Sequence, residues 1–111
     1  MENKTAVRAF VALGSEPRLN IFRLVVQRGA TGLYPCNIQE LLGIPGATLS
    51  FHLKELVSAS LLSVERQGRN LLYRPNATLT SQLVGFLVDN CCGGKPCGIN
   101  LKSLKKSKVR T

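Results

Sequence analysis

The stretch IQELLGIPGATLSFHLKELVSASLL contains two short helical patterns separated by a tight turn with glycine. In the second pattern Leu49, Leu53 and Leu56 recur after four and then three residues, so these side chains share one face of a helix. The first helix is expected to have its cap at Asn37 and its end at Gly43. Two short helices joined in this way are typical of a helix-turn-helix.

A hairpin is predicted directly after the second helical pattern. In LLSVERQGRNLLYRP the hydrophobic residues follow the alternation of β-strands, and the central QGRN supplies turn-forming residues. Arg66, Arg69 and Arg74 bracket the expected tip. A helix-turn-helix followed by such a basic hairpin predicts a winged helix, which is mainly α with a small β-hairpin wing.

Further helical patterns flank this unit. The first is expected to end at Gly14, the second to run from Ser15 to Gly29, and the last to follow Pro75. Their apolar stripes are, in chain order, Val7, Phe10 and Val11; Leu19, Phe22 and Val26; and Leu79, Leu83, Phe86 and Leu87.

The length and net charge of the chain limit the classes of protein to which it can belong. A chain of 111 residues indicates one domain, and a net charge of +9 favours a polyanionic partner. Residues 101–111 hold five Lys or Arg and no acidic residue. We therefore expect a winged helix-turn-helix domain over residues 1–100 and a basic, disordered tail over 101–111. No apolar run is long enough for a membrane span or a signal peptide, which predicts a cytoplasmic protein with reduced thiols.

Residues for DNA contact are expected on the second helix of the helix-turn-helix and on the wing. We expect the helix face opposite the leucines to carry Thr48, Phe51, His52, Glu55 and Ser58. Hydroxyl groups can bond to base edges or phosphates, and a phenyl ring can contact a thymine methyl. An ion pair between Arg66 and Glu65, away from the DNA, is the alternative for that arginine. The predicted contacts to double-stranded DNA are Thr48, Ser50, Phe51, His52, Lys54, Arg66, Arg69 and Arg74.

Three segments together resemble the ArsR/SmtB family of metal-responsive repressors. They are ALGSEPRLNIFRLV, IQELLGIPGATLSFHLKELVSASLL and VERQGRNLLYR, which occur in the family's order and spacing over roughly residues 12–75. The resemblance implies a homodimer whose first and last helices form the interface. It also implies a repressor that binds an operator and leaves it when an inducer binds.

One departure from the family pattern concerns the inducer site. Many arsenical-responsive members carry Cys-Val-Cys-Asp-Leu before the recognition helix, whereas this chain has Tyr34-Pro35-Cys36-Asn37-Ile38. Family members place their sensing cysteines at different points of the same scaffold, including the last helix. The segment NCCGGKPC near the end of the chain resembles such a relocated site.

The chemistry of this segment suits a soft metalloid. Trivalent arsenic or antimony prefers three thiolates in a pyramid, and Cys91, Cys92 and Cys97 supply that number within seven residues. Adjacent helical residues point about 100° apart, so the first two thiols converge only if the helix ends there. Gly93 and Gly94 allow that change of direction. The predicted inducer is arsenite, methylarsenite or antimonite.

Other roles for the cysteines stay open. With Cys36 they make four thiolates, the number for a closed zinc or cadmium site, although paired Cys-x2-Cys spacing is lacking. A thiol-redox switch is a third possibility, and for Cys36 alone a buried packing role is expected. An enzyme is not predicted, because His52 is the only histidine and no phosphate loop or paired acidic motif is present.

Overall fold

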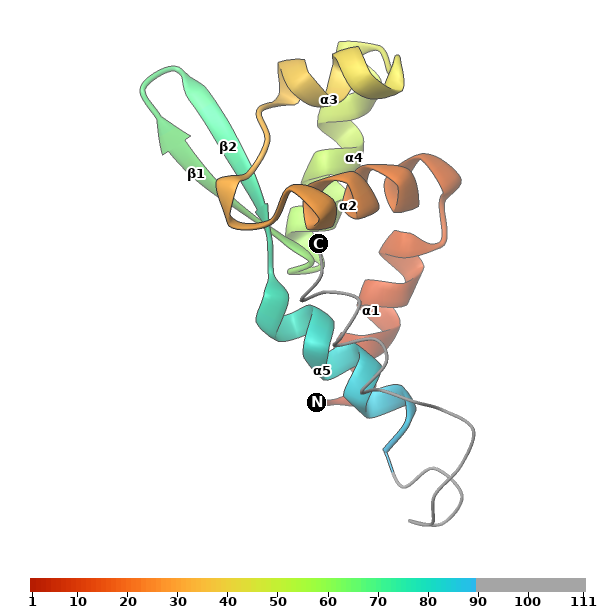
Figure 1. Cartoon of the computed structure of the whole chain (residues 1–111). Helices are drawn as coiled ribbons and strands as arrows, with labels where there is room; N and C mark the ends of the chain where they lie inside the picture. Colours follow the sequence, from red (N-terminus) through yellow and green to blue (C-terminus); the bar gives the residue numbers. More distant parts are fainter. Residues whose placement is uncertain (90–111) are drawn as a thin grey trace.

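The computed structural model describes residues 1–89 as a helical body with a two-stranded hairpin projecting from it (Figure 1). Cys91, Cys92, Cys97 and the predicted tail at 101–111 lie outside the described residues. The elements in chain order are α1 (Asn3–Leu13), α2 (Glu16–Arg28), the 3-10 turn η1 (Gly29–Thr31), α3 (Pro35–Leu42), α4 (Gly46–Ser58), β1 (Leu62–Gln67), β2 (Asn70–Pro75) and α5 (Ala77–Leu87).

The predicted helix-turn-helix is formed by α3 and α4. Leu49, Leu53 and Leu56 of α4 are all 1% exposed or less, so the leucine face is in the core as expected. They pack with Ile21 of α2 and Ile38 of α3, both fully buried. The second helix is therefore held by burial along its whole inner face.

The start of α3 differs from the prediction by three residues. The helix begins at Pro35, which fits the first turn because its missing N–H needs no partner there. Asn37 caps the helix from inside the first turn, since its Oδ1 accepts a hydrogen bond of 3.2 Å from the Tyr34 N–H. Gly43 ends the helix at φ 66°, a left-handed conformation that favours glycine.

The hairpin has the predicted tip. Gln67 pairs with Asn70, which leaves Gly68 and Arg69 as a two-residue loop with Gly68 at φ 63°. On its other edge β2 receives a short bridge from Leu33, whose backbone N–H and C=O both bond to Tyr73 at 2.9 Å.

Apart from Phe22, the residues that the first two helices bury are not those of their predicted apolar stripes. On α2 the buried residues are Ile21, Phe22 and Val25, whereas Leu19 is 40% exposed. On α1 the inner face consists of small residues, and the large residues of its apolar stripe point to solvent. The buried residues of α1 are Ala6, Ala9 and Ala12, and the exposed ones are Val7, Phe10 and Val11.

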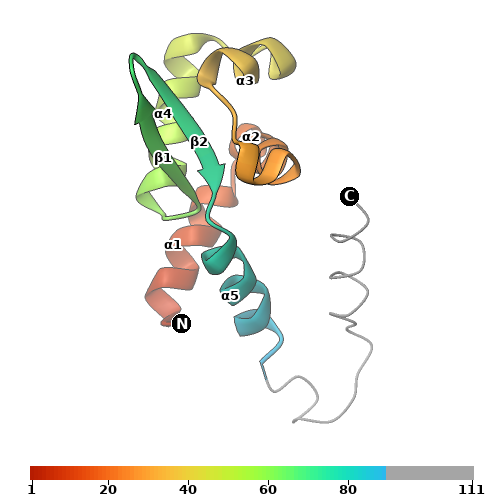
Figure 2. The same cartoon turned by 60° about the vertical axis from the view of Figure 1, so that its left-hand side comes forward.

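The last helix continues directly from the wing. Asn76 caps it through a hydrogen bond of 3.1 Å from the Leu79 N–H to its Oδ1. Leu79 and Leu83 are buried and Phe86 is half-buried, but Leu87 is 64% exposed. Figures 1 and 2 show α1 and α5 at one end of the molecule and α3 with the hairpin tip at the other. No helix within residues 1–89 is long and apolar enough to cross a membrane.

Candidate nucleic-acid interface

The outer side of α4 presents polar and aromatic side chains to solvent. Thr48, Ser50, Phe51 and Lys54 are all exposed, and Phe51 is 56% exposed despite its size. They are exposed because the three buried leucines fix the rotation of α4 about its axis. Their predicted contact with DNA requires this exposure and stays a prediction.

His52 does not lie opposite the leucines, so its assignment to that face was wrong. It follows Leu49 by three residues and precedes Leu56 by four, which places it beside the core face. The side chain is half-buried, and its Nδ1 is buried without a hydrogen-bond partner in the described part of the chain. Its ring lies against Phe51, with centroids 5.7 Å apart and planes inclined by 58°. A DNA contact by His52 stays a prediction.

The two arginines near the tip of the hairpin are exposed. Arg66 pairs across the hairpin with Leu71, and Arg69 lies in the two-residue loop. Neither forms an ion pair with any residue in 1–89, and the alternative that joined Arg66 to Glu65 is wrong. Both guanidinium groups are therefore available for phosphates.

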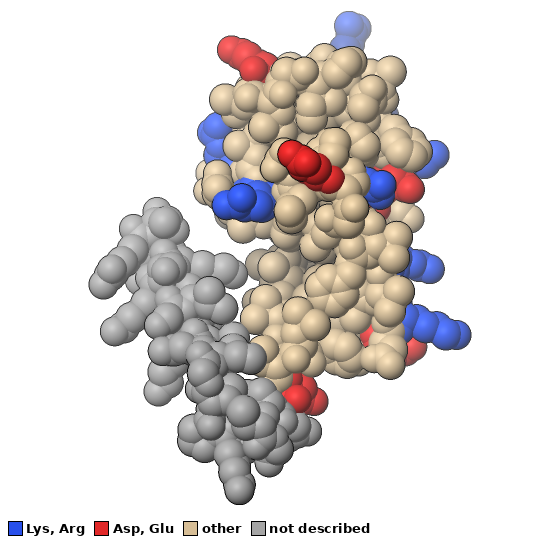
Figure 3. All heavy atoms as spheres, turned by 90° about the vertical axis from the view of Figure 1, so that its right-hand side faces the viewer, with Lys and Arg blue, Asp and Glu red and all other residues tan. Residues whose placement is uncertain are grey.

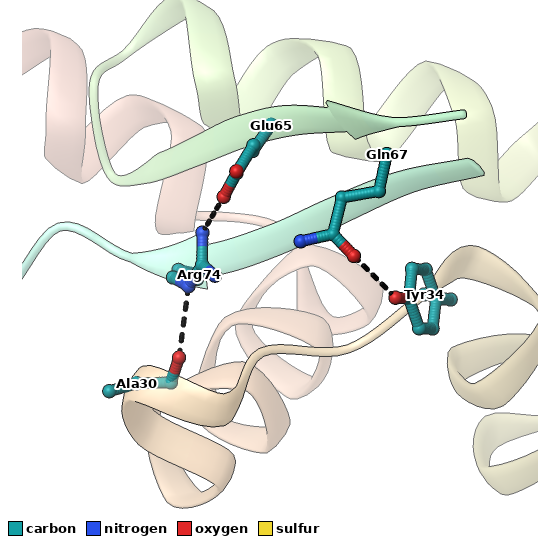
Figure 4. A network of polar contacts seen from close by, with 5 residues as sticks. All are labelled: Ala30, Tyr34, Glu65, Gln67 and Arg74. Carbon is teal, nitrogen blue, oxygen red and sulfur yellow. Dashed lines mark hydrogen bonds and ion pairs between the residues drawn. The ribbon is translucent and has the colours of Figure 1, made fainter. Parts of the chain in front are cut away.

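Arg74 lies at the base of the hairpin, opposite Ser63, and does not bracket the tip as expected. Its Nε donates a hydrogen bond of 2.9 Å to the Ala30 carbonyl oxygen, and its Nη1 forms an ion pair with Glu65 (Figure 4). The hydrogen bond and the charge of Arg74 lower the pKa of Glu65, and a hydrogen bond from Gln67 adds a smaller effect. Arg74 thus joins the wing to η1, the turn that follows α2; its contact with DNA stays a prediction.

A second polar contact to the wing was not found from the sequence. The Tyr34 hydroxyl donates a hydrogen bond of 2.7 Å to Gln67 Oε1, and Figure 4 shows the two side chains meeting between the loop before α3 and the end of β1. The two residues are 33 positions apart, so no local spacing predicts the contact.

Cys36 is exposed, and the buried packing role expected for it is wrong. It precedes the buried Ile38 by two residues, which turns it about 200° away from the core on a helix. Within residues 1–89, no three His, Cys, Asp or Glu side chains are placed to hold a metal ion.

The face that carries α1 has a different character from the side that carries α4 and the wing. Figure 3 shows charged side chains over the upper half and the edges of this face, and an uncharged area below the centre. The exposed apolar residues there include Val7 at 59% and Val11 at 67%. At the same end of the molecule, Leu87 of α5 is also exposed.

An exposed helix beside a basic hairpin, both fixed on a helical core, defines a winged helix-turn-helix DNA-binding protein. Residues 13–65 match the family model described as a helix-turn-helix domain. The arsenical resistance operon repressor of Bacillus subtilis (strain 168) is 32% identical over 83 residues, which cover 75% of this chain and 74% of that protein. The chain belongs to the ArsR family of DNA-binding transcriptional repressors, a family without enzymatic activity, as the sequence predicted.

Solved structures agree with the fold. An ArsR-like transcriptional regulator from Rhodococcus sp. RHA1 superimposes with a TM-score of 0.67 at 20% identity, covering 76% of each chain. A homodimeric winged helix-turn-helix DNA-binding domain from Mycobacterium bovis gives a TM-score of 0.64 at 23% identity, over 86% of this chain and 89% of that one. The predicted architecture, including the wing, is confirmed.

Proposed function

We propose that this repressor responds to trivalent arsenic or antimony, which bind Cys91, Cys92 and Cys97 and release the protein from operator DNA. The observation that carries the proposal is the relationship to an arsenical resistance operon repressor, 32% identical over most of both chains. Three thiols within seven residues of this chain supply the thiolate ligands that a trivalent arsenic or antimony centre prefers.

The ligand set follows from the donors that this chain offers. A trivalent arsenic or antimony centre supplies a soft acceptor that prefers thiolates to imidazole or carboxylate. The three cysteines of NCCGGKPC come shortly after α5, which ends at Leu87. Cys36 is separate from them in the sequence and is not needed for three-fold coordination.

DNA is bound by two surfaces with different tasks. Thr48, Ser50 and Phe51 on α4 read base edges in the major groove, and Lys54 contacts the backbone. On the wing, Arg66 and Arg69 contact phosphates or the minor groove without reading sequence. The support for this division is their exposure, together with the absence of ion pairs at the wing arginines within residues 1–89.

The repressor acts as a homodimer through α1 and α5. Val7, Phe10 and Val11 of α1 leave a large apolar surface in solvent, and Leu87 of α5 adds to it. A two-fold pair would cover these side chains and present two α4 helices to successive major grooves. The Mycobacterium bovis domain with the same fold is homodimeric, which supports this assembly.

The polar contacts around Asn76 connect α5 to the DNA-binding elements. Its side chain donates a hydrogen bond of 2.8 Å to the Ser60 carbonyl oxygen just after α4, and its N–H donates one of 2.9 Å to the Leu61 carbonyl oxygen before β1. A change at α5 therefore reaches both α4 and the wing. Ligand binding and DNA binding oppose each other through one coupling free energy, and about 1.4 kcal/mol suffices for a tenfold change in affinity.

The proposal is tested by replacing single cysteines and measuring release from operator DNA selected on the purified protein. Cys92→Ser and Cys97→Ser should bind this DNA as the wild type does and should no longer be released by arsenite. Cys36→Ser is the matched control, which should bind and be released normally. Antimonite, zinc and cadmium are titrated in parallel on the reduced protein.

Three results would overturn the proposal. Continued release of Cys92→Ser and Cys97→Ser by arsenite would place the inducer elsewhere. Loss of induction in Cys36→Ser, or unfolding of the wild type when zinc is removed, would establish a four-thiolate zinc site instead.

A further inference from the structure

The outer half of the wing has few attachments to the rest of the protein. The base of the hairpin is held by Arg74, and its middle by the backbone bridge between Leu33 and Tyr73. Beyond Tyr73, a single hydrogen bond joins the hairpin to the remainder of residues 1–89. That bond runs from the Tyr34 hydroxyl to Gln67 Oε1.

Gln67 lies where it can restrict the position of the hairpin tip. It is the last residue of β1, it pairs with Asn70, and it lies between Arg66 and the loop that contains Arg69. Because the hairpin loop has only two residues, holding Gln67 restricts the position of both arginines.

The two faces of the hairpin have separate roles. Side chains alternate between faces, so Glu65 and Gln67 share one face and Arg66 lies on the other. The first face meets the segment from Ala30 to Tyr34 (Figure 4). Arg66 is therefore free on the opposite face while its neighbours anchor the strand.

We propose that Tyr34 is a positioning residue for DNA binding, whose hydroxyl acts through Gln67 to set the angle at which the wing presents Arg66 and Arg69 to the DNA backbone. The inference rests on the proposed phosphate contacts of the wing. Tyr34 itself acts on the hairpin, and α4 keeps its own contacts with the bases.

The test uses a double-stranded DNA of fixed arbitrary sequence, because wing contacts to phosphates do not depend on sequence. Tyr34→Phe removes the hydroxyl and keeps the ring. We expect a loss of affinity of about two- to tenfold, the effect of one net hydrogen bond. Gln67→Ala should give a similar loss, and the double variant should lose no more than either single one.

The matched control is Tyr73→Phe, at the second tyrosine of the chain. Its hydroxyl has no hydrogen bond to any of residues 1–89, so its removal should leave DNA affinity unchanged. Urea unfolding of each variant separates a change in wing position from a loss of overall stability.

A double-mutant cycle that combines Tyr34→Phe with Arg69→Ala distinguishes an error in the proposed wing contact from an error in the positioning role of Tyr34. If Arg69→Ala alone leaves affinity and its salt dependence unchanged, the proposed wing contact is wrong. If Arg69→Ala weakens binding and Tyr34→Phe does not, the wing contact stands and the positioning role is overturned. We expect the effect of Tyr34→Phe to be smaller in the Arg69→Ala background and absent when Arg66→Ala is added; an undiminished effect with both arginines removed would show direct contact of Tyr34 with DNA and would also overturn the inference.

Discussion

The recognition helix and the wing are held in place by different kinds of interaction. Three leucines of α4 are buried almost completely, so any rotation of the helix would expose them. In the wing, Leu62, Leu72 and Tyr73 are buried, and a backbone bridge, an ion pair and the Tyr34 hydroxyl add polar contacts to the rest of the fold. The helix is therefore fixed by nonpolar burial along its whole inner face. The wing has a smaller buried surface and depends in addition on polar contacts that can change one at a time.

The largest difference between the two regions should appear in stability. Leu53→Ala should lower the free energy of unfolding by about 2–5 kcal/mol, because it removes a core side chain and leaves a cavity. Leu71→Ala on the wing is the control, since Leu71 is 37% exposed and should cost much less. Urea denaturation measures both. Equal losses would show that the wing is as much a part of the core as α4.

A smaller effect is expected where the loop before α3 meets the wing. Gly32 has φ 77°, and a Cβ there would lie 2.9 Å from the Tyr73 carbonyl oxygen. Gly29→Ala is the control, because Gly29 has φ 71° but open space around it. Both variants bear a backbone cost, and Gly32→Ala should lose about 1–3 kcal/mol more through overpacking. Thermal or urea unfolding would contradict this if the two losses were equal.

The two surfaces should also differ in how they affect DNA binding. Ser50→Ala should weaken binding to operator DNA by about three- to tenfold and leave binding to arbitrary DNA nearly unchanged. Arg69→Ala should weaken both and reduce the salt slope by about one. Titrations at several salt concentrations measure both quantities. A loss on both DNAs for Ser50→Ala would mean that Ser50 does not read sequence.

The smallest effect concerns pH and the base of the wing. Because Arg74 lowers the pKa of Glu65 in the folded protein, their pair stabilises the fold above the ordinary Glu pKa of 4.5. That contribution is lost as the pH falls through the lowered value. Glu65→Gln should therefore unfold more easily than the wild type at neutral pH, and the difference should disappear in acid. Glu40→Gln, outside any ion pair in residues 1–89, is the control.

The sequence predicted those parts of the fold that depend on local patterns. The leucine spacing of α4 indicated its buried face, and QGRN indicated the hairpin, because turn chemistry and strand alternation are both local. On α1 the same reasoning identified the stripe of large apolar residues, which the structure leaves exposed. The structure buries Ala9 and Ala12 instead, since a closely packed helix needs small side chains toward the core.

The sequence predicted the exposure of most residues of the candidate interface, but it did not predict the contacts that hold them in place. Exposure of Ser50 and Arg69 followed from their elements. The placement of Arg74 at the base of the wing depended on the pairing register, and its bond to Ala30 crosses 44 residues. The contact between Tyr34 and Gln67 spans 33 residues. Long-range polar contacts of this kind follow from the assembled fold.

The exposure of the large apolar side chains of α1 has a thermodynamic consequence. With alanines inward and Val7, Phe10 and Val11 outward, much of the hydrophobic free energy of this helix is gained only when another surface covers it. In the proposed homodimer, folding and subunit association are linked by mass action, so the midpoint of thermal unfolding should rise with protein concentration. The cellular amount of this repressor would consequently set its resistance to unfolding as well as its occupancy of DNA.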